Sequence, residues 1–248
     1  MLYDTHAHLT SPDFASDLPE VIERARAAGV TKIISIGTDL ESSTRSIQLS
    51  EQYSNVYAAV GWHPSDAAGA PDDVRSPLRS LAQHPKVVAI GEIGLDYYRL
   101  PSKVSGGTAS DDQRYQAKQK DVFRQQLELA AELGLNCVIH QRNSFEDTLA
   151  QVREFAGRVR AVFHCFSGPA GDLDRILAIG SLVSFTGILT FKNAQAVRES
   201  LAATPMGQFM IETDSPFLAP VPYRGKRCEQ AFVKETAVTR SLAYVTNS

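Results

Sequence analysis

Six side chains of metal-binding type stand at the ends of short apolar runs along this chain. Histidine, glutamate and aspartate are common ligands of catalytic divalent ions in proteins. The first two of the six close an apolar run at the N-terminus as Thr-His-Ala-His. One histidine after a strand is usually a core or surface residue, but chance is a poor explanation for six such endings. The predicted metal ligands are His6, His8, Glu92, His140, His164 and Asp214.

The spacing of these residues indicates how they would share metal ions. Side chains two positions apart in a strand point to the same face, so His6 and His8 can bind one cation together. Glu92 has two carboxylate oxygens and could bridge this cation to a second one, completed by His140 and His164. Two ions about 3.5–4 Å apart clamp an anionic substrate and lower the pKa of a bound water toward ~7. We therefore expect two or more divalent ions, and Mg²⁺, Mn²⁺ or Zn²⁺ would suit these ligands.

Two of the six residues are predicted to act directly in catalysis. Asp214 follows the last strand-like run, where one carboxylate oxygen could contact a metal ion and the other a bound water. It would accept the proton of the attacking water and return it to the leaving oxygen, a contribution of about 10²–10⁴-fold. Glu92 is the second predicted catalytic residue, because a bridging carboxylate would hold both ions in place.

The elements that must position these residues are short strands alternating with helices. Helical spacing of i, i+3, i+4 and i+7 joins Leu18, Val21, Ile22 and Ala25. Strands without polar alternation, each followed by a helix, indicate a parallel sheet covered by helices. Eight such units predict an α/β fold, a (β/α)8 TIM barrel of the metal-dependent hydrolase type, as one domain over residues 1–248. An open doubly wound sheet would not bring the ends of these strands to one point. The strand-like runs lie near residues 2–8, 32–37, 56–61, 87–93, 136–141, 160–166, 181–187 and 208–213.

The composition excludes several classes of protein. Hydrophobic content of 43%, charged content of 21% and a net charge of −3 describe a globular protein without a basic nucleic-acid coat or membrane-surface patch. A nucleic-acid substrate is still compatible with this charge, because a cleft can be locally positive on an acidic protein. Three cysteines without a C-x-x-C pair predict free thiols. Since we find no signal peptide and no apolar run of ~20 residues, we expect the protein in the cytoplasm.

One segment interrupts the alternation of strands and helices. Residues 100–112 contain a proline, a glycine pair and little apolar content, so we predict a flexible loop inserted after the fourth strand. A solvated spacer is the simpler interpretation. A lid or substrate-contact loop is the alternative, because loops that follow barrel strands border the active face.

Residues after the predicted strands provide candidates for substrate binding. Arginine pairs bidentately with phosphate oxygens, and we select Arg142 and Arg224 from the cationic residues in these loops. His63, in Gly-Trp-His-Pro, could contact substrate or a bound water, although packing behind the site is nearly as good an explanation. Tyr97, Tyr98 and Trp62 could stack on a base, which suits single strands or frayed ends, although core packing is the better explanation for at least one of them. The other cationic loop residues, which are solvated in the simpler interpretation, are Arg99, Lys103, Lys192, Lys226 and Arg227.

Taken together, these motifs resemble the TatD-type metal-dependent deoxyribonucleases of the amidohydrolase-like barrels. The resemblance covers nearly the whole chain and implies a (β/α)8-type barrel with two or more divalent ions, usually described as a magnesium-dependent nuclease. By matching position, it implies the same six metal ligands. The chain departs from the family pattern at Cys228, Glu229 and Gln230, in a longer segment at 100–112, and in ending at Ser248. The segments that carry the resemblance are residues 4–9, 61–64, 91–98, 138–140, 164–168, 212–216 and 224–227.

Three classes of function follow from these residues. The leading one is a metal-dependent hydrolase that cleaves phosphodiester bonds in DNA, with single strands or end regions as substrate. The alternative is an amide or ester hydrolase of the amidohydrolase type, such as an aminoacyl-tRNA deacylase. Glu92 occupies the place where many dinuclear amidohydrolases carry a carbamylated lysine, which favours the nuclease. A metal-binding scaffold without turnover is the third class, and the complete ligand set argues against it.

Overall fold

Eight parallel strands follow one another in chain order, as the apolar runs predicted. The structure is a computed structural model that describes the backbone of residues 1–245 and the side chains of residues 1–239. Residues 246–248 lie outside the described part. The strands are β1 (Leu2–Ala7), β2 (Val30–Ile36), β3 (Val56–Val60), β4 (Val87–Asp96), β5 (Asn136–Arg142), β6 (Ala161–Phe163), β7 (Leu182–Phe185) and β8 (Phe209–Ile211).

Helices follow the strands and cover them. In the first helix, Val21, Ile22 and Ala25 are buried, as their spacing predicted. The α-helices are α1 (Leu18–Ala27), α2 (Leu40–Gln52), α3 (Arg75–Ala82), α4 (Pro101–Val104), α5 (Ala109–Leu133), α6 (Phe145–Glu154), α7 (Ala170–Ala178), α8 (Gln195–Ala203) and α9 (Val233–Val245). Short 3-10 helices lie at η1 (Pro12–Phe14), η2 (Pro64–Gly69), η3 (Gly187–Thr190) and η4 (Gln230–Phe232).

The described chain divides into two compact units. The first unit contains residues 1–35, 49–57 and 164–248, and the second contains residues 36–48 and 58–163. The expectation of one domain over residues 1–248 stays a prediction.

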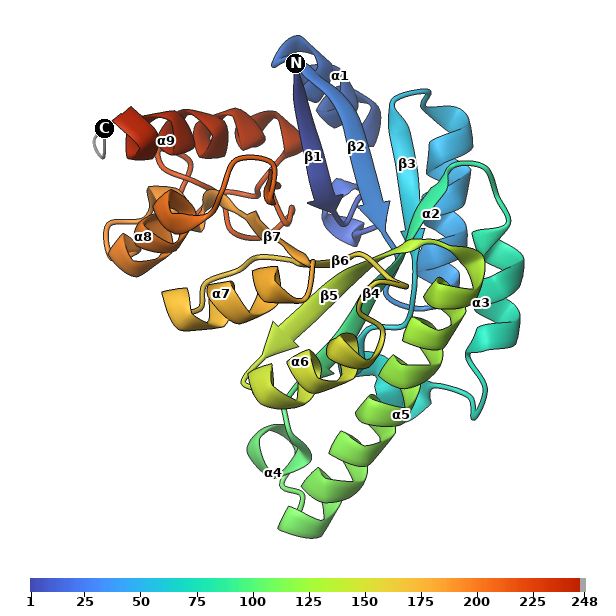
Figure 1. Cartoon of the computed structure of the whole chain (residues 1–248). Coiled ribbons are helices and arrows are strands. Elements are labelled where there is room, and N and C mark those ends of the chain that lie inside the picture. The colour runs from blue at the N-terminus through green and yellow to red at the C-terminus, as the bar shows by residue number, and fades with distance from the viewer. Residues whose placement is uncertain (246–248) are drawn as a thin grey trace. The chain divides into compact units, whose positions relative to one another are not determined.

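The first unit contains β1, β2, β7 and β8. Strand β1 pairs with β2, β7 pairs with β8, and a parallel bridge joins Ala7 to Ser215 beyond the end of β8. Helices α8 and α9, orange and red in Figure 1, pack against each other. The core beneath α1 includes Ala7, Leu9 and Ile33, all at most 2% exposed. Both histidines of the Thr-His-Ala-His motif are therefore carried by a buried strand and the residues just after it.

The second unit contains β4, β5 and β6, with the last three residues of β3. The longest helix of this unit, α5, packs against β4, and α4 contacts the N-terminal end of α5 (Figure 1). Two glycines allow β4 and β5 to approach closely around Glu92. A Cβ on Gly91 would lie 2.6 Å from that of Val138, and a Cβ on Gly94 would collide with the carbonyl of His140. This bears out the close approach that Gly-Glu-Ile-Gly indicated.

The prediction of an irregular loop at residues 100–112 is wrong for most of that segment. Residues 101–104 form α4, and α5 begins at Ala109. Thr108 and Asp111 form a reciprocal capping box, in which each side chain accepts the other residue's backbone N–H. The Ser102 hydroxyl and backbone N–H both donate to Asp112. Polar residues that resemble a loop in the sequence are here the cap that starts a 25-residue helix.

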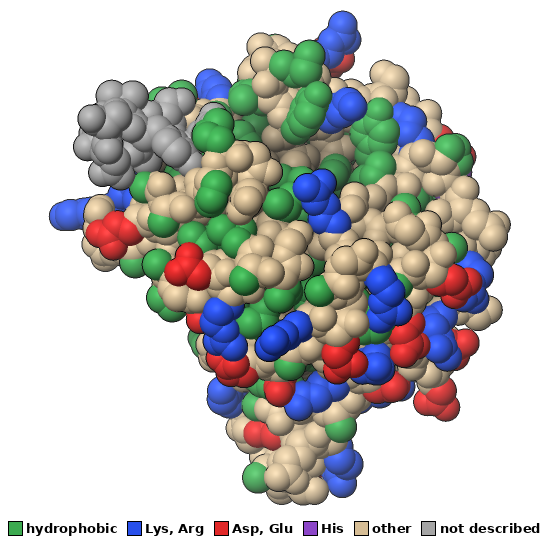
Figure 2. All heavy atoms as spheres, in the orientation of Figure 1, with side chains coloured by type: hydrophobic (Ala, Val, Ile, Leu, Met, Phe, Trp, Pro, Cys, Tyr) green, Lys and Arg blue, Asp and Glu red, His purple; other side chains and the backbone are tan. Residues whose placement is uncertain are grey.

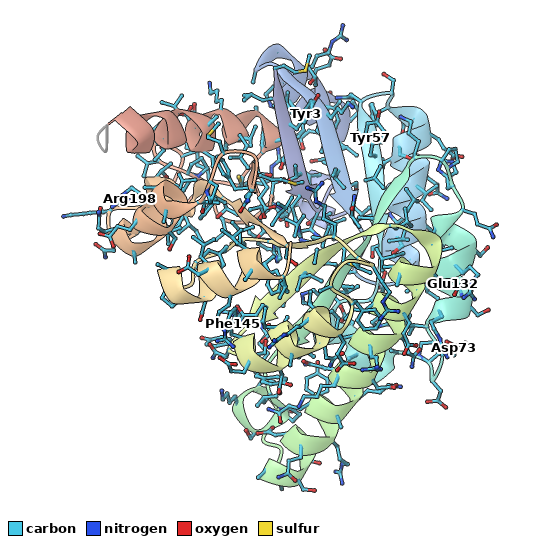
Figure 3. All side chains as sticks on the ribbon, in the orientation of Figure 1. Tyr3, Tyr57, Asp73, Glu132, Phe145 and Arg198 are labelled. Carbon is cyan, nitrogen blue, oxygen red and sulfur yellow. The ribbon has the colours of Figure 1, made fainter. Side chains whose placement is uncertain are left out.

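The surface of the second unit mixes charges of both signs. Figure 2 shows Lys, Arg, Asp and Glu side chains interspersed over α5 and α6. Ion pairs join Arg124 to Glu154 at 2.8 Å and Lys120 to Asp147 at 2.8 Å. On α5, Glu132 pairs with Arg79 of α3 (Figure 3). Within the described residues, every helix is too short or too polar to cross a bilayer.

Candidate metal centre

Three predicted ligands converge at one point of the first unit. The Nε2 atoms of His6 and His8 are 3.3 Å apart, and Asp214 Oδ1 lies 3.6 Å and 3.4 Å from them. Metal–nitrogen bonds of about 2.0–2.1 Å in a tetrahedral site place neighbouring donor atoms about 3.3–3.4 Å apart. The triangle of His6, His8 and Asp214 therefore has the size that a divalent cation requires.

His164 belongs to the same unit and lies against His6. The two imidazole rings are stacked with centroids 4.1 Å apart, and His164 Nδ1 lies 3.5 Å from Glu212 Oε1. His6, His164 and Glu212 form a second group whose donor atoms lie within 4.8 Å of one another. Glu212 was not among the metal ligands that the sequence predicted. Its position two residues before Asp214 was the signal that could have found it.

A buried carboxylate supports the turn that carries Asp214. Asp4 accepts hydrogen bonds from the Thr213 hydroxyl at 2.6 Å and the Thr213 backbone at 2.9 Å. Burial raises the pKa of Asp4 to about 7, although the hydrogen bonds from Thr213 and His6 oppose this. Sequence reasoning also missed Asp4, which lies two residues before His6.

The backbone at Asp214 has a conformation that few residues other than glycine adopt. Its φ is 58°, and its N–H donates to the carbonyl of His6 at 2.9 Å. The N–H of His8 donates in turn to the carbonyl of Ser215 at 2.8 Å. Non-glycine residues with positive φ are concentrated at functional sites, where the surrounding contacts stabilise a strained backbone. These two hydrogen bonds tie the end of β1 to the Asp214 turn.

Asp214 is ionised in this surrounding. Burial opposes the charge of its carboxylate, but a hydrogen bond from His8 and the charges of His6 and His164 outweigh burial. They hold the pKa of Asp214 below its ordinary value of 3.8. An ionised carboxylate can bind a cation and accept a proton.

The second unit contains a separate cluster of the same kind. His140 Nδ1 lies 2.8 Å from Glu92 Oε1, and its Nε2 lies 3.3 Å from Asp96 Oδ2. Glu92 is 3% exposed and also faces His63 Nε2 at 3.5 Å. His63, Glu92 and His140 place donor atoms within 4.8 Å of one another. Asp96, four residues after Glu92 at the end of β4, was missed as a partner of His140.

The hydrogen bonds of His63 distinguish it from a metal ligand. Its Nδ1 accepts the backbone N–H of Ser65 at 3.1 Å, and burial lowers the pKa of the imidazole. In the neutral ring the proton therefore lies on Nε2, directed at Glu92. A protonated nitrogen cannot bind a cation. His63 therefore directs its N–H at Glu92 in this arrangement, and its contact with substrate or water stays a prediction.

The two arginines predicted to bind substrate are each stacked on an aromatic ring. In the second unit, the guanidinium carbon of Arg142 lies 3.8 Å from the ring centroid of Tyr98. In the first unit, that of Arg224 lies 3.9 Å from the ring centroid of Phe191. Stacking fixes the plane of each guanidinium. Arg224 also donates from Nη1 to the carbonyl of Ala219 at 3.3 Å, so part of its guanidinium is already engaged.

Arg227 is committed to ion pairs within the first unit. Its guanidinium donates to Asp17 through two bonds of 2.7 Å and to Glu229 at 2.9 Å. Glu229 also accepts from Arg24 at 2.7 Å. The hydrogen bond from Arg227 lowers the pKa of Asp17 to about 2, with a further contribution from Arg24, and burial opposes this shift. Arg227 therefore joins the start of α1 to the segment before η4.

Replacing Arg227 with methionine is expected to lower the melting temperature by about 2–4 °C at pH 6. Asp17 has a lowered pKa, so its contribution is complete above the ordinary carboxyl pKa of 3.8 and declines as the pH falls toward 2. The difference in melting temperature between wild type and variant should therefore shrink from pH 6 to pH 3. Arg26→Met, which removes an exposed pair with Glu23, is the control and should change little. An unchanged melting temperature for Arg227→Met would contradict this role.

Comparison with known proteins identifies the family. The model of the TatD-related DNase family matches residues 3–245. The chain belongs to this family of metal-dependent hydrolases. It is 41% identical over 240 residues to an uncharacterized metal-dependent hydrolase, YabD, of Bacillus subtilis, covering 96% of this chain and 89% of that protein. It is 34% identical over 221 residues to the 3'-5' ssDNA/RNA exonuclease TatD of Enterobacter lignolyticus, covering 88% of this chain and 80% of that protein.

A solved structure confirms the fold. The crystal structure of the TatD homologue YJJV from Escherichia coli K12 is 28% identical, with a TM-score of 0.84. The alignment covers 99% of this chain and 95% of that one. The fold is the amidohydrolase-type TIM barrel, as the eight strand and helix units predicted.

Proposed function

We propose that this protein is a metal-dependent deoxyribonuclease that hydrolyses phosphodiester bonds in single-stranded DNA or at DNA ends. The observation that carries the proposal is the triangle of His6, His8 and Asp214, whose donor atoms have the spacing of a metal site. The substrate class is supported by the Enterobacter lignolyticus relative, a 3'-5' ssDNA/RNA exonuclease. The three free cysteines are compatible with a cytoplasmic location.

The two clusters give the chain's own residues distinct tasks. His6, His8, His164 and Asp214 would hold one divalent ion, and Glu92 and His140 would hold another. When bound, such ions supply Lewis acidity and a water of lowered pKa. Mg²⁺, Mn²⁺ and Zn²⁺ all suit this set of imidazoles and carboxylates.

The remaining steps use protein groups. Asp214 would take the proton of the attacking water on a carboxylate oxygen and return it to the leaving oxygen. His63 would turn its Nε2 hydrogen bond from Glu92 to substrate or water, while Arg142 and Arg224 bind phosphate oxygens through their planar guanidinium groups.

A parallel assay tests this function. Purified protein with Mg²⁺, Mn²⁺ or Zn²⁺ is given labelled single-stranded DNA, duplex DNA, a p-nitrophenyl ester and aminoacyl-tRNA. We expect cleavage of single-stranded DNA that stops when EDTA is added. Turnover of the ester or aminoacyl-tRNA alone would replace the nuclease with the amidohydrolase alternative, and metal binding without turnover would indicate a scaffold.

Removing Arg142 is expected to weaken substrate binding without affecting the chemical step. Arg142→Met should raise KM for single-stranded DNA about tenfold, because a hydrogen bond to a charged group contributes about 1.5–3 kcal/mol. Its kcat should stay within about twofold of wild type, since uniform binding energy changes KM alone. Arg99→Met, in the same loop region, is the matched control. Equal KM values for the Arg142 and Arg99 variants would exclude this role.

A further inference from the structure

An exposed aromatic ring stands beside the first metal-type cluster. Phe217, three residues after Asp214, is 57% exposed to solvent. Its ring meets that of His8 edge to face, with centroids 6.0 Å apart. A single exposed apolar side chain is common on a protein surface, but this ring also lies against a residue of the metal-type cluster.

Hydrogen bonds hold the turn that carries this ring. The N–H of Phe217 donates to the carbonyl of Asp214 at 2.9 Å, and the N–H of Cys228 donates to the carbonyl of Pro216 at 3.0 Å. The Gln230 side chain donates to the Ser215 hydroxyl at 2.6 Å. Cys228 and Gln230 therefore hold this turn in place and limit where the ring can lie.

The following residues dock on η3 in the same unit. A Cβ on Gly187 would lie 2.6 Å from the carbonyl oxygen of Leu218, so the two backbones are in direct contact. The N–H of Val221 donates to the Thr190 hydroxyl at 2.8 Å. The end of η3 is held in turn by Arg198 of α8, labelled in Figure 3, which donates to the carbonyl of Phe191 at 2.9 Å. Hydrogen bonds and close backbone contacts therefore hold the chain both before and after Phe217.

We infer that Phe217 stacks on a nucleobase of the substrate, next to the phosphodiester group held at the cluster of His6, His8 and Asp214. The inference rests on the proposed function and adds the feature of the substrate that the site recognises. Every base offers a π face, so stacking is tolerant of sequence. In a duplex these faces are already covered by neighbouring bases. The ring therefore selects single strands and frayed ends without reading sequence.

The test compares substrates with and without bases. An ordinary oligonucleotide and an abasic one of equal length carry the same phosphates, so only stacking differs. Phe217→Ala should weaken binding of the ordinary oligonucleotide about tenfold and leave binding of the abasic one unchanged. Phe217→Trp should restore binding, and Met206→Ala, which truncates another exposed apolar side chain, is the matched control. Binding is read by fluorescence anisotropy in EDTA, and KM and kcat are measured separately with metal.

The possible outcomes distinguish base stacking by Phe217 from the proposed nuclease activity. Equal binding by Phe217→Ala and wild type overturns the stacking, whether or not the DNA is cleaved. A similar loss on both oligonucleotides also overturns it, because it shows a structural role in the turn. Base-dependent binding without hydrolysis supports the stacking and overturns the nuclease. A wild-type protein that binds neither oligonucleotide and cleaves no DNA with metal overturns both.

Discussion

A Glu92→Gln protein is expected to lose bound metal and, with it, at least about 100-fold in kcat/KM. Glu92 is 3% exposed, and its Oε1 lies 2.8 Å from His140 Nδ1 and 3.5 Å from His63 Nε2. The substitution preserves volume but replaces an anionic oxygen with a neutral amide, which is a much weaker ligand for a cation. Even partners that only orient ligands cost 10–100-fold in metal affinity when mutated, so loss of a direct ligand should cost at least about 100-fold.

Metal binding by the Glu92→Gln protein is tested by two measurements that do not depend on its catalytic activity. Metal content is measured on the purified protein, and melting temperature is measured with increasing divalent metal. A ligand at about 100 times its dissociation constant stabilises the folded state by about 2.7 kcal/mol, and Glu92→Gln should lose most of that increase. Glu128→Gln, the same chemical change at a partly exposed site on α5, should behave as wild type. A Glu92→Gln protein with full metal content would show that Glu92 is not a metal ligand.

The strands and the ends that carry the ligands could be predicted because both follow from local pattern. A strand buried on both faces must be a short apolar run, and functional side chains of a TIM barrel stand where such runs end. Strand β4, for example, has all but one of its ten residues buried, and its run Val-Val-Ala-Ile identified it directly. The helical spacing from Leu18 to Ala25 likewise required no knowledge of distant residues.

Contacts between distant residues were outside the reach of such patterns. Asp4 and Thr213 are 209 positions apart, and nothing local indicates that one holds the backbone of the other. The stacking of Arg142 on Tyr98 depends in the same way on the register between β4 and β5. At residues 100–112 the local signal itself was ambiguous, because threonine, aspartate and glycine serve both in loops and in helix caps. The capping box at Thr108 and Asp111 was present in the sequence as Thr-x-x-Asp.

Asparagine at position 214 is expected to lower turnover by about 10²–10⁴-fold while substrate binding is largely retained. Asp214 stands in the strained conformation at φ 58°, and its carboxylate faces both His6 and His8. Asparagine tolerates this backbone conformation nearly as well as aspartate, so the turn and the Phe217 ring should keep their places. What the substitution removes is the basic oxygen that would accept the proton of the attacking water.

The combination of measurements separates this role from simple metal binding. An Asp214→Asn protein should keep much of its metal, because His6 and His8 still provide two imidazole ligands, and its KM should stay close to wild type. Its kcat should fall with kcat/KM, which is the signature of an interaction made only in the transition state. Asp174→Asn, an exposed aspartate of α7, is the control for the chemical change. If Asp214→Asn keeps its metal and near-normal kcat, the proton is accepted by another group. If it loses metal in proportion to its activity, Asp214 acts as a ligand alone.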